Sequence, residues 1–241
     1  DTVIADGVVV AKQGRMLVDL APPKYPDFVK RSIHLKRQLT AEDFVVKAPI
    51  EEGKVKVHVI GVVEAKVFTK HLQEELPVEK GKVQLSVGKD IAKVAVVERH
   101  KLTGNIGLGF VSGFGFKEGA VASSVAHDSH NLLVVGMNDY DMAIAVNKLA
   151  EVGGGMNAVK NGETKGMVEL PIAGLMSDEP VEKVSEQVEK LYKAWVALGC
   201  TMASPFMTMS LLALPVLPEL RITDKGLVDT QKFRLLDLFV E

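Results

Sequence analysis

A short polar segment between two apolar runs carries the residue types best suited to chemistry. His127, Asp128 and His130 lie within four positions of one another. Ser129 and Asn131 lie beside them. Two imidazoles and a carboxylate at this spacing could ligate a metal, relay a proton or hydrogen-bond the edge of a heterocycle, because neutral imidazole offers one donor and one acceptor. The alternative interpretation is a turn in which the Asp and Ser satisfy backbone groups while the histidines are solvated.

A second polar cluster follows another apolar run and consists of Glu98, Arg99 and His100. Arg99 could form a structural ion pair with Glu98 or with a carboxylate elsewhere, or it could line a site, and both interpretations stay open. We take Glu98 and Arg99, together with Ser129 and Asn131, as candidate substrate-binding residues. We take the two histidines and the aspartate of the first segment as candidate catalytic residues.

Other residues that resemble functional motifs have simpler explanations. The glycines between positions 104 and 119 lack both the P-loop lysine pattern and a strand-Gly-x-Gly-x-x-Gly-helix unit, so close backbone packing explains them better than phosphate binding. Cys200 follows a predicted helix C-terminus, where the helix dipole disfavours a thiolate. His34, His58 and His71 have no ligand-like spacing and are assigned no role.

Composition excludes several classes of partner. The chain has 241 residues, 47% of them hydrophobic, which is enough for one sizeable core or two smaller ones. Its formal net charge of -2 leads us to expect neither nucleic acid nor an anionic membrane surface as a partner. The longest apolar run, Leu211–Leu217, contains Pro215 and is too short to cross a bilayer. The single cysteine and the lack of a signal-peptide pattern favour a cytoplasmic location.

The N-terminal residues predict short strands and then a connector. Val3–Val10 places Asp6–Gly7 between two β-rich runs, which indicates a hairpin or small meander. Three prolines between Ala21 and Asp27 interrupt all periodicity, so we interpret residues 21–53 as a connector. Residues 54–241 then form the main domain.

The candidate residues must be positioned by a sheet. Val55, Val57 and Val59 alternate with polar residues, and period two is typical of a strand. Further β-rich runs, separated by turns, are Val94–Val97, Ile106–Val111, Val121–Val125 and Leu132–Val135. Together these runs predict a multi-stranded sheet that carries the polar segments at its strand ends.

Two helices are expected to pack on that sheet. The first is Asp139–Val152, with Asn138 or Asp139 as its cap and Gly153–Gly155 as its stop. The second begins after Ser177–Pro180. Its predicted apolar face comprises Val181, Val184, Val188, Leu191, Trp195 and Leu198. Between the helices, Asn161–Gly162 predicts a tight hairpin. Because no regular βαβα alternation is visible, we expect an α+β fold rather than a doubly wound sheet.

Several of these segments resemble adenine deaminases of the amidohydrolase superfamily. The resemblance is carried by residues 119–131 (GAVASSVAHDSHN), 171–178 (PIAGLMSD) and 205–215 (PFMTMSLLALP), and it extends through residues 98–100, 104–105, 218–220 and 3–9. It therefore covers essentially the whole chain.

The resemblance implies a fold in three segments. Residues 1–20 would be the end of the amidohydrolase β-sandwich, residues 21–53 the connector, and residues 54–241 the adenine deaminase C-terminal α+β domain. The family's catalytic TIM-like barrel is absent from this chain, and because the first residue is Asp1 rather than Met, we expect the barrel to precede it.

The resemblance also implies an activity, which is the hydrolytic deamination of adenine to hypoxanthine and ammonia by metal-activated water. The manganese or iron centre would be held mainly by the missing barrel, because no His-x-His and no later histidine pair with a terminal aspartate occurs here. We therefore predict no metal ligands within this chain. His127, Asp128 and His130 would face the purine pocket or its metal centre. The expected partners are adenine, the barrel-bearing part of the same enzyme and further copies in a homo-oligomer.

Two other functions stay open. The chain could be a non-catalytic scaffold that supports the barrel and mediates oligomerisation through apolar helix faces. It could also be a small self-contained metal hydrolase that uses His127, His130 and a carboxylate as its own site.

Overall fold

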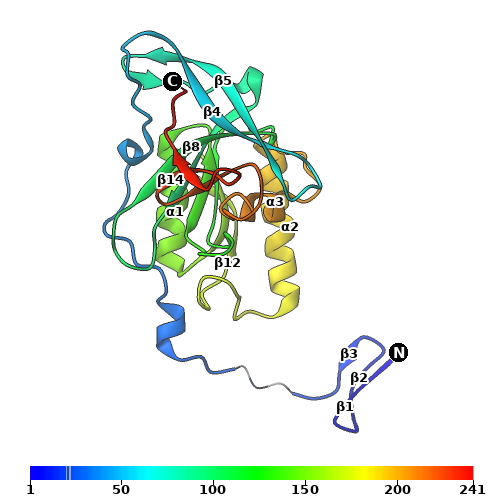
Figure 1. The fold of residues 1–241 in the computed structure, drawn as a ribbon. Coiled ribbons are helices and arrows are strands. Elements are labelled where there is room, and N and C mark those ends of the chain that lie inside the picture. Colours follow the sequence, from blue (N-terminus) through cyan, green and yellow to red (C-terminus); the bar gives the residue numbers. More distant parts are fainter. Residues whose placement is uncertain (20, 22, 241) are drawn as a thin grey trace.

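The chain folds around one large mixed sheet, with a small sheet at each end of the sequence (Figure 1). The computed structural model describes residues 1–19, 21 and 23–240. Residues 20, 22 and 241, which the predicted segments include, lie outside the described residues. No helix within the described ranges combines the length and the apolar character needed to cross a membrane.

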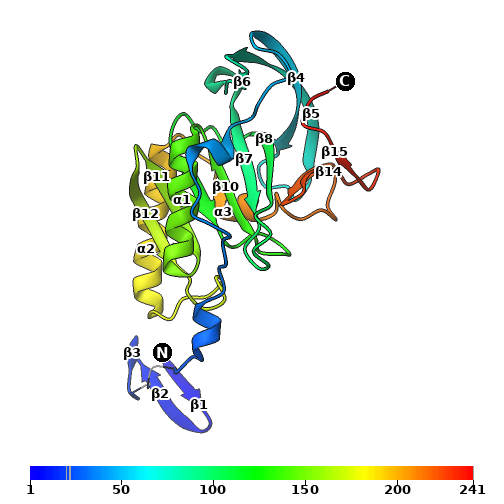
Figure 2. The same ribbon diagram turned by 90° about the vertical axis from the view of Figure 1, so that its left-hand side faces the viewer.

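The N-terminal sheet is an antiparallel meander of β1 (Thr2–Ala5), β2 (Val8–Lys12) and β3 (Arg15–Met16). The predicted hairpin or meander is thus confirmed. Figures 1 and 2 show it apart from the rest of the molecule. Its apolar side chains, among them Val3 and Ile4, are exposed, so this sheet has no core of its own.

The central sheet has nine strands in the order β12-β11-β9-β10-β7-β8-β4-β5-β6, and only the β4–β8 pair is parallel. The strands are β4 (Gly53–Val62), β5 (Thr69–Glu79), β6 (Lys82–Val83), β7 (Ile91–Val97), β8 (Ile106–Ser112), β9 (Ala120–Ser123), β10 (Leu132–Gly136), β11 (Gly155–Lys160) and β12 (Glu163–Glu169). Every strand that the apolar runs predicted is present. The predicted Asn161–Gly162 turn joins β11 to β12.

Both faces of the central strands are buried. Along β7, Val94 and Val96 join one apolar cluster, whereas Ala95 and Val97 join another. Successive side chains of a strand point to opposite faces, so these two clusters lie on opposite sides of the sheet. A strand buried on both sides reads as a continuous apolar run, which is why the sequence located β7 and β10 well.

One α-helix covers each face of the sheet (Figure 1). Helix α1 (Asp139–Val152) is capped by Asn138, whose side chain accepts a hydrogen bond from the Asp141 N–H, and ends at Gly153 with a φ of 84°. Helix α2 (Val181–Ala197) packs on the opposite face. A short helix, α3 (Pro205–Ser210), follows it. Both long helices confirm the sequence prediction.

The predicted apolar face of α2 becomes more deeply buried from the first turn toward the C-terminus of the helix. Trp195 is 1% exposed, as the helical spacing predicted, and its ring lies 5.0 Å from that of Phe206 on α3, centroid to centroid. Val184 and Val188 are half-buried against the same cluster. The prediction for Val181 was wrong: it is 75% exposed, because the first turn of α2 lies before the part of the helix that packs on the sheet.

The C-terminal sheet consists of β13 (Leu220–Thr223), β14 (Gly226–Asp229) and β15 (Arg234–Leu236), and it lies against β8. A Cβ at Gly107 of β8 would lie 1.9 Å from the Thr223 carbonyl oxygen. This close approach confirms that glycine here serves backbone packing. The 3₁₀ turns η1 (Asp27–Lys30), η2 (Ala41–Phe44) and η3 (Val87–Lys89) complete the described elements.

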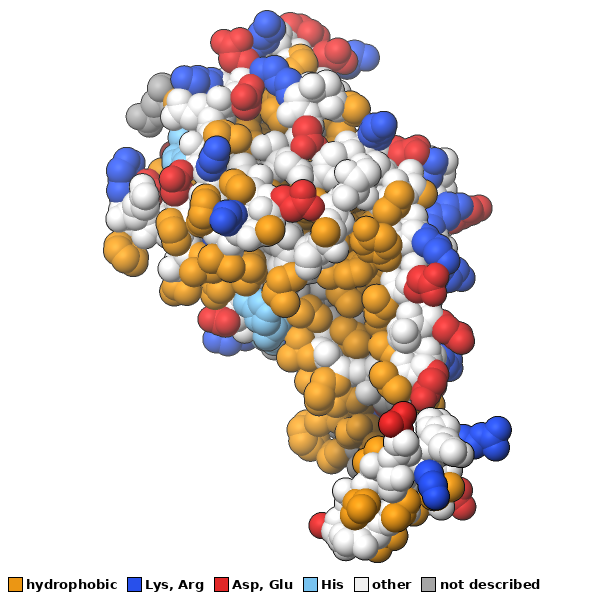
Figure 3. Space-filling view, turned by 90° about the vertical axis from the view of Figure 1, so that its right-hand side faces the viewer, with side chains coloured by type: hydrophobic (Ala, Val, Ile, Leu, Met, Phe, Trp, Pro, Cys, Tyr) orange, Lys and Arg blue, Asp and Glu red, His pale blue; other side chains and the backbone are white. Residues whose placement is uncertain are grey.

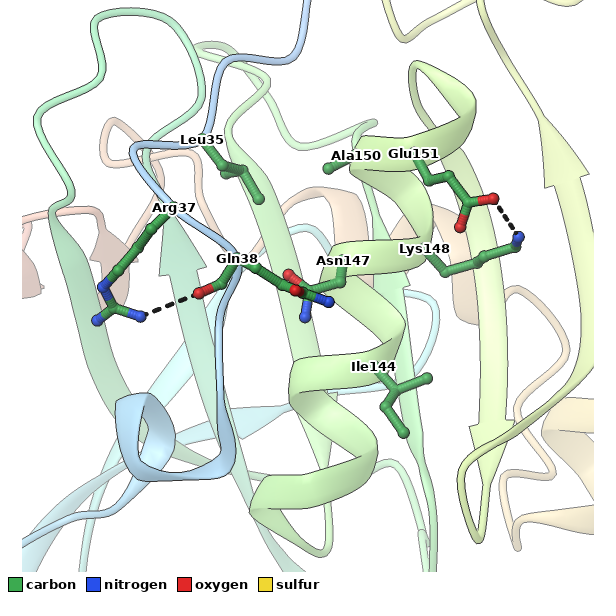
Figure 4. Close-up of a pocket in the computed structure, with 8 residues that line it drawn as sticks. All are labelled: Leu35, Arg37, Gln38, Ile144, Asn147, Lys148, Ala150 and Glu151. Carbon is green, nitrogen blue, oxygen red and sulfur yellow. Dashed lines mark hydrogen bonds and ion pairs between the residues drawn. The ribbon is translucent and has the colours of Figure 1, made fainter.

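Part of the predicted connector packs on the core. Leu39, Phe44 and Val46 are buried. The amide of Asn147 on α1 donates to the Leu39 carbonyl (2.8 Å) and accepts from the Leu39 N–H (2.9 Å). Figure 4 shows Asn147 directed at this segment in a groove of about 530 Å³. Both polar groups of the Asn147 amide are therefore engaged in holding the Leu39 segment against α1.

Candidate functional site

The loop between β9 and β10 holds the predicted catalytic residues. His127 and His130 are half-buried with ring centroids 5.1 Å apart, whereas Asp128 and Ser129 are exposed. The loop follows a strand buried on both faces and precedes another, so its two ends are fixed by the sheet. Two imidazoles are therefore presented together at the end of a rigid scaffold.

His130 is oriented by the backbone. Its ring Nδ1 accepts a hydrogen bond from the Ala126 N–H (3.2 Å), and its backbone N–H donates to the Ala126 carbonyl (2.7 Å). A neutral ring with Nδ1 as acceptor carries its proton on Nε2. Burial, followed by the nearby His127 and the Arg99 guanidinium, lowers the pKa of His130. The ring is therefore neutral at neutral pH and offers an Nε2–H donor.

His127 is held through its backbone. Its N–H donates to the carbonyl of Ser210 at the end of α3 (3.0 Å). Within the described part of the chain, no hydrogen bond engages its ring. Among the described residues, the side chains of Asp128 and Ser129 make no hydrogen bond to the ring of His127 or His130; the bond to His130 comes from the Ala126 N–H.

Arg99 lies beneath the loop and is buried. Its Nε donates to the His130 carbonyl, and its two terminal nitrogens donate to Ser32 Oγ (3.1 Å) and to the Ala173 carbonyl (3.1 Å). Burial lowers its pKa. In the described residues its partners are neutral oxygens, so the ion pair weighed from the sequence is not formed and the guanidinium joins three separate segments.

Glu98 and Asn131 also have partners inside the protein. The Glu98 carboxylate accepts from the N–H groups of His100 (2.5 Å) and Lys101 (2.8 Å) and from the N–H of Thr103 (3.0 Å). Burial raises the pKa of Glu98, but these bonds outweigh it, and the net effect lowers that pKa. Asn131 Oδ1 accepts from the Arg99 N–H (3.2 Å). Both candidate substrate-binding residues thus have hydrogen-bond partners within the chain, and their contact with substrate stays a prediction.

Two further segments border the loop, and residue chemistry alone did not assign them to it. Ser124 Oγ donates to the Gly174 carbonyl (2.6 Å), so residues 171–176 lie against the loop's start. The Ser210 carbonyl brings α3 to His127. These are the other two segments that carry the family resemblance, and that resemblance was the available signal.

A second pair of histidines lies on the paired strands β4 and β5. His58 Nδ1 and His71 Nε2 are 2.8 Å apart, so one ring donates to the other. Burial and then the neighbouring His71 lower the pKa of His58. Their positions in the sequence gave no indication of the pair, because it depends on the register of two strands.

The described residues contain no group of three or more His, Cys, Asp and Glu placed to hold a metal ion. Cys200 is buried, and burial raises its pKa, which keeps the thiol protonated.

A family model and several curated relatives match the part of the chain that contains the histidine loop and the two segments beside it. The family model described as "Adenine deaminase C-terminal domain" matches residues 66–234. The chain is 58% identical over 238 residues to the adenine deaminase of Moorella thermoacetica, and 51% identical over 239 residues to that of Clostridium botulinum (Type A). That of Ruegeria pomeroyi is 46% identical over 240 residues. Each alignment covers 99% of this chain but 40% of the relative, so the chain spans about two fifths of the length of these curated relatives.

Proposed function

This chain belongs to the adenine deaminase C-terminal domain family, and we propose that it forms the C-terminal part of an enzyme that hydrolyses adenine to hypoxanthine and ammonia. In this proposal residues 1–20 complete a β-sandwich and the catalytic barrel lies in the part of the relatives that this chain does not match. A cytoplasmic location and a homo-oligomeric assembly belong to the same proposal.

The reaction requires proton transfers that imidazoles can perform. Water adds to the purine carbon that bears the amino group, and the C–N bond to that group then breaks. The water loses a proton and the departing nitrogen gains one, so that ammonia leaves and the ring keeps the oxygen. A positioned imidazole can take the first proton and return it to the leaving group, which typically accelerates such steps by about 10²–10⁴-fold.

We assign these transfers to His127 because its ring is free of hydrogen bonds in the described part of the chain. His130 would act as a donor through Nε2, with Asp128 and Ser129 exposed beside it for contact with substrate. Arg99 would hold the loop through the His130 carbonyl, Asn131 would hold the backbone of Arg99, and Glu98 would order residues 100–103. The observation that carries this assignment is the pair of half-buried imidazoles fixed 5.1 Å apart at a strand end.

The manganese or iron centre of the family does not fit the described residues, which form no ligand set. We therefore place that centre in the remaining part of the enzyme and assign this chain no metal ligand.

A second function is favoured by the same buried contacts. The side chains of Arg99, Glu98 and Asn131 all bond to groups of the chain itself, as those of structural residues do, so the chain could support the barrel without contacting adenine. In that case, replacing either imidazole would leave turnover unchanged.

A chimera tests the proposal. The matched two fifths of the Moorella thermoacetica relative are replaced with this chain, and ammonia release from adenine is measured. We expect the chimera to deaminate adenine, and both the relative without its matched part and the isolated chain to be inactive. Full activity of the relative lacking that part, or a folded chimera with no activity, would contradict the proposal.

A further inference from the structure

The segments that are hydrogen-bonded to the histidine loop, directly or through one further segment, carry large apolar side chains that are more than half exposed. This apolar rim comprises Phe28 (76%), Val67 (58%), Met176 (58%), Met207 (57%) and Val216 (73%). Figure 3 shows one face of the molecule, on which apolar surface in orange gathers beside a patch of imidazole surface in pale blue. Large exposed apolar surface that gathers on one face of a folded protein marks an interaction site.

Hydrogen bonds connect the segments that carry Phe28 and Met176 to the histidine loop. The Ala173 N–H donates to the carbonyl of Val29, the neighbour of Phe28 (2.6 Å). The same 171–176 segment carries Met176 and is held by Arg99. Phe28 and Met176 are therefore fixed relative to the histidines rather than placed on independent loops.

The buried side chain of Arg221 connects the segments that carry Val67, Met207 and Val216. Arg221 donates to the carbonyls of Leu211 (2.9 Å), Leu217 (3.0 Å) and Val67 (2.5 Å). These bonds join the end of α3 to the segments that carry Val216 and Val67. Because Ser210, at the end of α3, holds His127, Met207 belongs to the same frame. The backbone segments that carry the rim are thus fixed before binding, which lowers the cost of ordering them on binding.

We propose that the apolar rim is the surface by which this chain docks on the remaining part of its enzyme. The inference rests on the proposed function and deepens it by naming the interface. Three fifths of each relative's length lies outside the match, which supplies an occupant of sufficient size. Docking around the rim would leave the enclosed imidazoles facing the partner's pocket.

A second copy of this chain fits the surface less well. Two copies seated rim to rim would cover His127 and His130 in both, and adenine could not reach them. The exposed methionines suit a heterologous surface, because their flexible thioether side chains adapt to irregular partners.

Hydrogen exchange on the chimera described above tests this interface. We expect amides of α3 and of residues 171–176 to exchange on the order of tenfold more slowly in the chimera than in the 241-residue chain, because docking excludes solvent and opposes local opening. The double variant Met176→Glu, Met207→Glu should lose this protection. Val87→Glu is the matched control: Val87 is 50% exposed on η3, which precedes β7, whereas Arg99 follows the other end of that strand.

Circular dichroism and thermal unfolding establish that each variant folds. If the double variant unfolds, Phe28→Ser gives the same test at a side chain with little packing to lose. Equal exchange in chimera and isolated chain, or protection that survives the rim variants, would overturn the interface. Protection that rises with the concentration of the isolated chain would assign the rim to a second copy and also overturn it. An inactive chimera with protected amides would contradict the proposed function alone.

Discussion

The molecule contains two pairs of histidines, and their ring nitrogens have different partners. In the His58–His71 pair, one ring donates directly to the other across 2.8 Å. In the His127–His130 pair, the rings meet edge to face, and only His130 has a hydrogen-bond partner, a backbone N–H, among the described residues. In the first pair, the hydrogen bond between the two rings joins strands β4 and β5. The second retains nitrogens that a substrate could engage.

The supports of the two pairs differ as well. His58 and His71 stand on adjacent strands, so register alone brings them together. The His127–His130 loop depends on Arg99, Ser124 and Ser210, whose bonds reach segments far away in the sequence. The comparison shows that proximity of imidazoles does not by itself indicate a site; free ring nitrogens held by a dedicated frame are the better criterion.

The largest expected effect is on the apolar core that packs α2 and α3 against the sheet. Replacing Trp195 with Ala should destabilise the chain by about 3–5 kcal/mol, because the indole is fully buried and the surrounding core can collapse only in part. Because Trp195 contacts Phe206 on α3, and α3 holds His127, the loss of the indole should disorder the loop of His127 before it disorders β4 and β5. Urea unfolding monitored by circular dichroism measures the free energy of unfolding, and a loss within about 0.5 kcal/mol, the range of surface substitutions, would contradict the packing.

Removing Arg99 should disturb one pair and leave the other intact. In the chimera, Arg99→Met should lower turnover by up to roughly 10²-fold, since small displacements of a positioned group carry that cost. The guanidinium lowers the pKa of His130, so its removal should also raise that pKa and move the acidic limb of the pH–rate profile upward.

Two outcomes distinguish positioning from general stability for Arg99. In the Arg99→Met variant, nuclear magnetic resonance titration should show a raised pKa for His130 and an unchanged pKa for His58. Arg99→Lys keeps the charge but not the three-way hydrogen bonding, so it should retain the pH profile while losing turnover. A lower melting temperature with normal turnover and an unmoved His130 pKa would assign Arg99 a structural role only.

The smallest effect concerns pH and stability. The pKa of His58 is lowered in the folded chain, so below the ordinary value of 6.5 the unfolded state binds a proton that the folded state does not. Stability should therefore be complete above pH 6.5 and fall as the pH drops through the folded pKa, by at most about 1.4 kcal/mol per pH unit for one histidine. Asp229 opposes part of this shift. His58→Gln should flatten the dependence; an unchanged slope would show that other groups cause it.

The sequence predicted the strands that are continuous apolar runs, and it predicted both long helices from their periodicity and caps. It missed β5, because Thr69–Glu79 is largely polar and contains Pro77, which is tolerated near a sheet edge. It also missed β13, β14 and β15, which have four residues or fewer.

The candidate site was predictable in its residues but not in its frame. The His-Asp-Ser-His motif is local and visible in the sequence. The contacts of Arg99 with His130, Ser32 and Ala173 span 31, 67 and 74 residues, and no local pattern encodes such distances. For the same reason the His58–His71 pair was invisible: it requires both the existence and the register of β5.

The central claim is that His127 belongs to a site and His71 does not, and one measurement tests it directly. Turnover of adenine per folded molecule is determined for the chimera and for its His127→Ala and His71→Ala variants. We predict that His127→Ala lowers turnover by about 10²-fold or more with nearly unchanged folding, the usual scale for a positioned proton-transfer group, and that His71→Ala leaves turnover within about twofold. Normal turnover per folded molecule in His127→Ala, together with a sharp loss of thermal stability, would contradict the account and leave this chain as a scaffold.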